Sequence, residues 1–227
     1  MAAQNTPPEA GRPHAGTQLI SEWIVDTPER QRAAADALLG EWRALVSAFR
    51  PAAFLRLACF ASDDGRVLLS HAQWAGDEAH LAFVRTHRSD MIGRIDKEVP
   101  GIQRPGLTRY TVAHSLRLDS GDARTHTGDA GTSSDAGTLT LVRARTGIPE
   151  VTALWAAATA ERVRRIRPAG VRTVRLLGSK DGTHGLLLVQ GPWPANADDT
   201  RPADGAHAGV HLCEPRGFRL IGSVEGP

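Results

Sequence analysis

The sequence contains few of the residues that mark a disulfide-rich, zinc-binding or nucleic-acid-binding protein. Cys59 and Cys213 are the only cysteines among 227 residues, and no CxxC pair occurs, so we expect no disulfide framework. Lys97 and Lys180 are the only lysines, and the formal net charge is +2. A chain this close to charge balance gives no indication of a nucleic-acid partner or of an anionic membrane surface.

Long apolar runs are also missing. No stretch is apolar enough to span a bilayer, and the polar segment 1–16 has no apolar core for export, so we interpret it as a disordered lead-in. The GxGxxG pattern that holds dinucleotides is absent as well. These absences predict a soluble cytoplasmic protein without a resident nucleotide cofactor.

What the chain has instead is an internal repeat, in which short motifs recur 117 residues further on without a gap. The recurring residues are Arg50-Pro51-Ala52 with Arg167-Pro168-Ala169, and Ser62, Asp64 and Gly65 with Ser179, Asp181 and Gly182. Self-similarity at a fixed offset indicates one supersecondary unit present twice. Differences between the two copies then indicate where chemistry is retained.

The first copy, residues 17–118, has the pattern of one α+β unit. Alternating apolar residues predict strands, and Pro28 and Pro51 bound the first helical stripe. The predicted elements are a strand over 18–25, a helix over 28–49, hairpin strands over 54–61 and 66–74, a helix over 77–98 and a strand over 108–118. This β-α-β-β-α-β order is the ferredoxin-like unit.

The second copy, residues 138–227, follows a Gly- and Ser-rich segment over 119–137 that we interpret as a flexible linker. It repeats the first strand, the first helix and the hairpin, but residues 192–199 carry two prolines where the second helix belongs, which disfavours a helix there. Two sheets, each covered by helices on one face, can pack bare face to bare face. We therefore predict two ferredoxin-like repeats that form an intramolecular dimeric α+β barrel.

Two segments of the first copy resemble the antibiotic biosynthesis monooxygenase family. They are Leu19–Val25 followed by Pro28–Gln31, and Gln73–His80. The tandem arrangement is similar to oxygenases that tailor aromatic polyketides, including those that open a ring of angucyclines. The resemblance implies oxidation of a polycyclic phenol or quinone with O2, by hydroxylation, quinone formation or C–C ring cleavage, without metal or haem. For some relatives it also implies reduced flavin (FADH2 or FMNH2) supplied by a partner reductase.

The strand over 66–74 predicts where a substrate would bind. Ser70, Ala72 and Trp74 share one face because side chains alternate, and Trp74 leads directly into the second helix. Small residues beside a large aromatic leave room for a flat ring system between sheet and helix. The corresponding face of the second copy, with Gly185, Leu187 and Val189, has neither Trp nor a polar group, so we assign the chemistry to the first copy.

The second helix supplies candidate catalytic groups. His80, His87 and Arg94 are spaced by seven and form one row beside the apolar stripe of Val84 and Met91. An imidazole can deprotonate a phenol, and a guanidinium can stabilise an oxyanion or a developing peroxide. We predict His80, Arg94 and Trp74 as catalytic residues. The predicted substrate-binding residues are Ser70, Trp74, Val84, His87, Met91, Trp23 and Tyr110.

The resemblance is incomplete at these positions. Where the family has Asn, Trp, Tyr and Arg, this chain has Ser70, Trp74, His80 and Arg94, which matches only the Trp and the Arg. The departure is compatible with an oxidation other than simple quinone formation. Two other classes of function also stay open, a non-catalytic barrel that binds an aromatic ligand and a polyketide cyclase of the same fold. A homodimer is a further expectation that the sequence leaves open.

Overall fold

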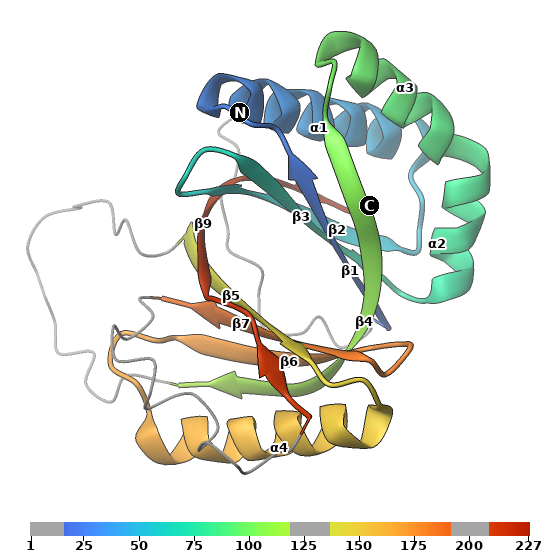
Figure 1. Ribbon diagram of the computed structural model, residues 1–227. Helices are drawn as coiled ribbons and strands as arrows, with labels where there is room; N and C mark the ends of the chain where they lie inside the picture. Colours follow the sequence, from blue (N-terminus) through green and yellow to red (C-terminus); the bar gives the residue numbers. More distant parts are fainter. Residues whose placement is uncertain (1–15, 119–136, 192–208) are drawn as a thin grey trace, which may run out of the picture. The chain divides into compact units, whose positions relative to one another are not determined.

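The computed structural model describes residues 16–118, 137–191 and 209–227 as an α+β protein (Figure 1). The chain divides into two compact units, one formed by the residues up to Thr111 together with Phe218–Pro227, and one formed by Val112–Gly217. The predicted disordered N-terminal segment, flexible linker and interrupted second helix of the second copy fall almost entirely outside the described residues. None of the described helices is long and apolar enough to cross a membrane.

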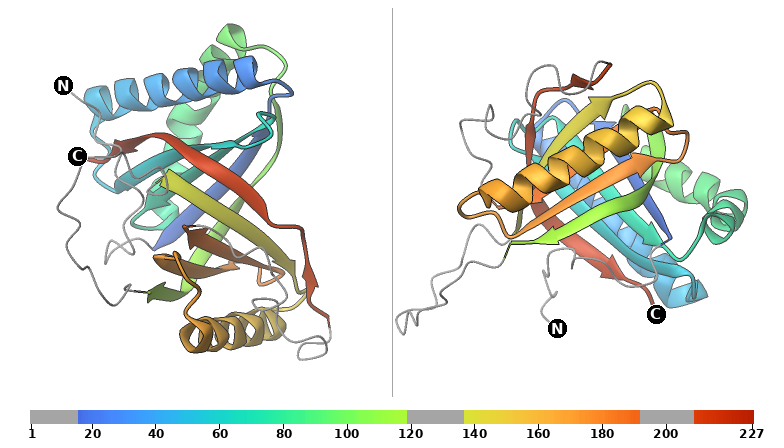
Figure 2. Two further views of the ribbon diagram at one scale, coloured as in Figure 1. Left: turned by 90° about the vertical axis from the view of Figure 1, so that its left-hand side faces the viewer. Right: turned by 90° about the horizontal axis from the view of Figure 1, so that it is seen from below.

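The first unit is an antiparallel sheet covered by helices on one face (Figures 1 and 2). Its strands lie in the order β4-β1-β3-β2-β9. They are β1 (Thr17–Ile24), β2 (Phe54–Ser62), β3 (Val67–Trp74), β4 (Gln103–Arg117) and β9 (Arg216–Glu225). The helices are α1 (Pro28–Phe49) and a second helix in three parts, α2 (Asp77–Phe83), η1 (Val84–Arg88) and α3 (Ser89–Glu98).

The two ends of helix α1 are set by capping residues in its sequence. The Thr27 hydroxyl accepts a hydrogen bond from the Arg30 N–H at 3.2 Å, and Pro28 occupies the first turn, where no intrahelical donor is needed. Arg50 adopts a left-handed conformation (φ 43°) at the C-terminus and donates its N–H to the Val46 carbonyl. Its repeat partner Arg167 does the same, with φ 46°, at the end of the second unit's helix.

The second helix differs from the regular helix that we predicted over 77–98. Residues 84–88 form a π-helical turn between two α-helical segments. A π turn is wider than an α turn, so it rotates the residues that follow it relative to those before it. This change of phase decides which side chains of the helix face the sheet.

The repeated Ser-x-Asp-Gly motif forms the same hairpin turn twice. Asp64 accepts hydrogen bonds from the Ser62 hydroxyl and the Arg66 N–H, and Asp181 does so from Ser179 and Thr183. The glycines have φ of 71° and 73°, a conformation that disfavours any residue with a Cβ. A Cβ on Gly65 would also lie 2.6 Å from the Pro28 ring.

The second unit contains one described helix. Strands β5 (Thr138–Arg145), β6 (Thr173–Ser179), β7 (His184–Gln190) and β8 (His211–Leu212) pair antiparallel in the order β6-β7-β5-β8. Helix α4 (Pro149–Ile166) covers this sheet (Figure 2, right). Its buried Trp155 and Ala160 pack into the core of the unit.

The two compact units do not coincide with the two sequence repeats, because the last strand of each repeat lies at least partly in the other unit. Strand β9, from the second repeat, pairs with β2 of the first unit. The end of β4 belongs to the second unit, where the Leu118 N–H donates to the Arg172 carbonyl at 2.8 Å. The closure of the two sheets into one barrel stays a prediction.

Candidate functional site

A cavity of about 60 Å³ lies in the first unit between the sheet and its helices. Its floor comes from β1 and β3, where Ser21 and Ser70 lie directly opposite one another in the register. The two serines are small, so they leave space that a larger pair would fill. Side chains of α1, the second helix and β4, together with Leu57 of β2, form the rest of the wall.

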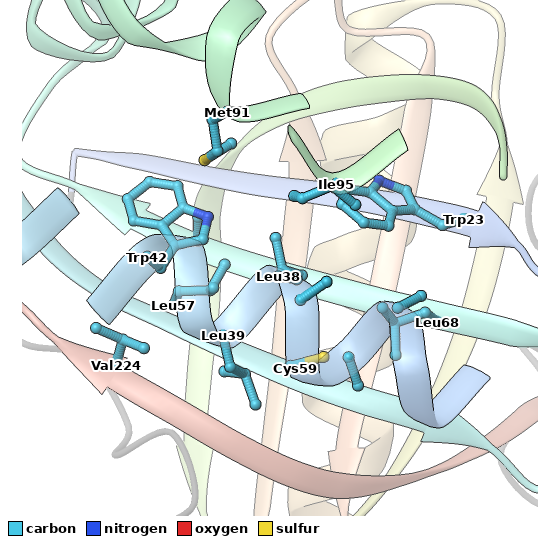
Figure 3. Packing of buried hydrophobic residues seen from close by; sticks show 14 of the residues in the cluster. Trp23, Leu38, Leu39, Trp42, Leu57, Cys59, Leu68, Met91, Ile95 and Val224 are labelled. Atoms are coloured by element: carbon cyan, nitrogen blue, oxygen red, sulfur yellow. The ribbon is translucent and has the colours of Figure 1, made fainter. Parts of the chain in front are cut away.

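The cavity is lined mainly by apolar and aromatic side chains. Figure 3 shows several of the buried side chains around it, including Trp42 from α1, Met91 from α3 and Trp23 from β1. Among the residues that line the cavity, none is Asp or Glu, and the exposed Arg88 connects it with the surface. Such a surface suits a flat aromatic ligand better than a charged metabolite.

Trp74 is the centre of an aromatic cluster on the helix-covered face of the sheet. Its ring centroid lies 6.3 Å from Trp42, 5.4 Å from Phe54 and 5.3 Å from Phe83. The side chain is 1% exposed, and its Nε1–H has no hydrogen-bond partner in the described part of the chain. A buried N–H without a partner carries a desolvation cost of about 1–3 kcal/mol, which a ligand oxygen that accepts from it would remove.

His80 lies against Trp74, with the two ring centroids 5.5 Å apart. The imidazole is 4% exposed, and its Nδ1 lies 3.3 Å from Nη2 of Arg109 on β4. Burial, followed by the positive charges of Arg109 and Arg88, lowers the pKa of His80 to about 4, although Asp77 acts in the opposite direction. An imidazole with this pKa is neutral at physiological pH and is a weak base.

The structure brings five of the predicted site residues together at the cavity. They are Trp23, Ser70, Trp74, His80 and Met91. Four others, Val84, His87, Arg94 and Tyr110, do not line it. No group of three or more His, Cys, Asp or Glu in the described ranges is arranged to hold a metal ion.

Arg94 is not placed at the cavity. Its guanidinium forms a bidentate ion pair with Glu41 of α1, with an Nη2–Oε2 distance of 2.7 Å, and its side chain is 60% exposed. The expected row assumed an unbroken α-helix from His80 to Arg94. The π turn between them shifts the phase, so that Arg88 lines the cavity and Arg94 does not.

His87 and Val84 lie in the π turn itself, away from the cavity lining. The His87 ring packs on the exposed Phe49 ring at a centroid distance of 4.5 Å. Val84 is partly buried against the core. Neither side chain lines the cavity, although both were predicted to bind the substrate.

Tyr110 lies on the opposite face of the sheet. It is paired with Gln18, whereas its neighbour Arg109 is paired with Leu19, which lines the cavity. Since successive side chains of a strand point to opposite faces, Tyr110 and Arg109 point apart. Tyr110 is therefore wrong as a cavity residue, and Arg109, one position earlier in the same alternating strand, is the residue on the helix-covered face.

The corresponding space in the second unit is filled. At the repeat offset, Leu38 and Leu68 are replaced by Trp155 and Gly185. A Cβ on Gly185 would lie 2.2 Å from the Trp155 ring, so the indole occupies the volume above the strand. This packing supports the assignment of the site to the first unit.

The chain matches no protein-family model. No curated protein matches it either. Solved structures do resemble it over nearly their whole length. An anthrone oxidase-like protein aligns with a TM-score of 0.64 at 15% identity, covering 93% of both chains. A candidate monooxygenase from Fusobacterium nucleatum aligns with a TM-score of 0.55 at 10% identity, covering 94% of this chain and 97% of its own.

A chlorite dismutase variant from Candidatus Nitrospira defluvii aligns with a TM-score of 0.54 at 12% identity over 92% of each chain. At these identities the likeness shows a shared fold. The function has to be argued from the site.

Proposed function

We propose that this protein is an oxygenase of the antibiotic biosynthesis monooxygenase type that oxidises a polycyclic aromatic phenol or quinone with O2. The observation that supports this most directly is the aromatic cavity of the first unit, where Trp74, whose Nε1–H has no partner in the described chain, packs against the neutral imidazole of His80. The anthrone oxidase-like and monooxygenase neighbours share the fold that carries this cavity. An aromatic polyketide, of the angucycline type or another, is the substrate class that we infer.

The chemistry needs an electron-rich anion rather than a strong protein base. In quinone formation, a phenol and O2 give a quinone and water, with one oxygen atom entering the new carbonyl. The electrons come from the ring, and the phenol proton and the ring hydrogen leave with the water. The protein's task is to hold the anion, donate hydrogen bonds to its oxygen and exclude bulk water.

Hydroxylation, or ring cleavage that inserts one oxygen atom into a C–C bond and releases the other as water, would need two more electrons, which reduced flavin from a partner reductase would supply. The cavity does not fit a flavin ring beside a substrate, because its volume is about 60 Å³ and small-molecule sites usually measure about 300–1,000 Å³. We propose that reduced flavin, where it takes part, is a soluble co-substrate, which is tested by O2 uptake with and without it.

The same volume requires the site to open when a polycyclic ligand enters. We propose that the π turn over 84–88 moves, because π turns inside helices are frequent at functional sites and this one follows Phe83, which lines the cavity. A ligand that fills the cavity should slow backbone hydrogen exchange over 83–92. This change is measurable without turnover.

The test is O2 uptake with anthrone or 1-naphthol, with and without FMN and a flavin reductase. We expect substrate-dependent uptake with stoichiometric quinone product. Tight binding of the phenol without uptake under either condition would instead favour the non-catalytic ligand-binding alternative, and a product of unchanged oxidation state would favour a cyclase. Sedimentation of the same sample tests the expected homodimer.

A further inference from the structure

Arg109 is the residue on β4 that determines the state of His80. Its Nη2 lies 3.3 Å from the His80 Nδ1, and among the described residues it is the one hydrogen-bond partner of that imidazole. A guanidinium has only donors. The Nδ1 atom is therefore the acceptor, and the proton of the neutral ring must lie on Nε2.

The other charged groups around the imidazole do not reverse this assignment. Arg88 of η1 also disfavours a proton on the ring, and Asp77 of α2, which favours one, accepts a hydrogen bond from the Thr17 hydroxyl at 2.8 Å. A doubly protonated His80 would direct its Nδ1–H at the Arg109 guanidinium. Burial and repulsion thus act together, so the ring stays neutral with one fixed tautomer.

The fixed tautomer changes what the cavity offers a ligand. The two ring nitrogens lie on opposite sides of the imidazole, so the Nε2–H points away from Arg109. The His80 ring also packs against Trp74, at a centroid distance of 5.5 Å, and the Trp74 Nε1–H has no protein partner in the described ranges. Both rings line the cavity.

We propose that Arg109 is a positioning residue that fixes His80 as a neutral imidazole with its proton on Nε2, so that the cavity presents two N–H donors to one acceptor oxygen of an aromatic ligand. This inference rests on the proposed function for the nature of the ligand. It replaces the predicted role of His80 as a base by that of a hydrogen-bond donor. The favoured ligand is a phenolate or an aromatic ketone, whose oxygen accepts from both rings.

The tautomer is measured by long-range ¹H–¹⁵N correlation spectra of the labelled protein, with His80→Gln to assign the signal. We expect a Nε2–H tautomer that does not titrate between pH 5.5 and 8. Arg109→Leu should raise the pKa and mix the tautomers, whereas Arg109→Lys, which keeps a cationic donor, should restore the wild-type spectrum. Arg104→Leu is the matched control on the same strand, since that guanidinium contacts Asp96 and Trp23 rather than His80.

The donor role is tested with 4-nitro-1-naphthol, whose oxygen ionises, against 1-nitronaphthalene, which lacks that oxygen. We expect the naphtholate to shift the His80 Nε2–H signal, and we expect its affinity to fall about tenfold in Arg109→Leu. The losses of naphtholate affinity in Arg109→Leu and His80→Leu should not add in the double variant, because Arg109 affects the ligand through His80. Additive losses would overturn the proposal, and so would a wild-type His80 that titrates near its ordinary pKa or carries its proton on Nδ1.

These measurements need no turnover. A protein that binds naphtholate through His80 but consumes no O2 would refute the oxygenase and leave the donor pair standing.

Discussion

At the scale of single residues, the site depends on polar groups that the protein leaves without partners or holds in one protonation state. Trp74 and Trp155 illustrate the first case, because the Nε1–H of each is buried without a hydrogen-bond partner in the described chain. Trp74 lines a cavity, whereas Trp155 is packed against Gly185. The same residue type therefore has a candidate chemical role in one unit and a packing role in the other.

Trp74→Phe should separate stability from function. An aromatic ring is kept and no protein hydrogen bond is lost, but the phenyl ring is smaller than the buried indole, so we expect the free energy of unfolding to fall by about 1–3 kcal/mol. The loss of a donor to a developing oxyanion should lower kcat by about 10²-fold or more. Urea unfolding and O2 uptake measure the two effects, and Trp155→Phe is the control that should leave O2 uptake intact. Equal turnover of Trp74→Phe and the wild type would remove Trp74 from the site.

The lowered pKa of His80 predicts a pH dependence of stability. Its folded-state pKa of about 4 lies below the ordinary value of 6.5, so between these values the unfolded chain binds the extra proton. His80 therefore causes stability to fall as the pH is lowered from 6.5 toward 4. In His80→Gln this part of the loss should disappear, which urea unfolding at pH 4.5, 5.5 and 7 can measure. Parallel pH profiles for the variant and the wild type would contradict the assignment.

At the scale of elements, the two hairpin turns show that a short motif can determine local structure. The π turn shows that the sequence pattern of a helix does not determine which of its side chains face the sheet. The Ser-x-Asp-Gly turns follow from local chemistry, since a carboxylate accepts bonds from residues two positions away on either side. The π turn over 84–88 has no comparable signature in the sequence. It forms within a helix that packs on the sheet and on α1, so tertiary packing selects it.

A pair of glycine substitutions tests the turn. Gly65→Ala places a Cβ at positive φ and against the Pro28 ring, so we expect a loss of about 1–2 kcal/mol or more in the free energy of unfolding. Gly40→Ala, in the exposed middle of α1 with open space around the new Cβ, should stabilise by up to about 1 kcal/mol. Urea unfolding measures the free energy of unfolding of both variants and of the wild type. A neutral Gly65→Ala would show that the turn adopts another conformation in solution.

At the scale of the whole molecule, the two cysteines report on unfolding. Cys59 lies in β2 at 0% exposure, where burial and the nearby Asp36 raise the pKa of its thiol, while Cys213 is half-buried. A buried thiol with a raised pKa reacts slowly because the thiolate is the nucleophile.

We expect a thiol reagent to modify Cys213 in the native protein and Cys59 only when the first unit opens. In the variant Cys213→Ser only Cys59 can react. The rate of its modification should rise with urea concentration in parallel with the change in tryptophan fluorescence that reports unfolding. Rapid native modification of Cys213→Ser would show that β2 is more accessible than its packing indicates.

The sequence by itself determined the order of the elements of the first copy, the repeated caps and turns, and the face of β3 that carries Ser70 and Trp74. These features depend on local rules, namely strand alternation, proline at helix starts and glycine at positive φ. The sequence also indicated that the second copy lacks the chemical groups of the first, because Leu187 and Gly191 stand where the first copy has Ser70 and Trp74.

Only the tertiary structure decided which side chains reach the cavity. Arg94 was expected there and is held at the surface by Glu41, because the π turn changes the phase of the helix. Arg109 was not expected there and reaches His80 because β4 pairs with β1 in a register that places it beside the cavity. The protonation of His80 likewise depends on burial and on a neighbour 29 residues away, and local sequence spacing contains neither.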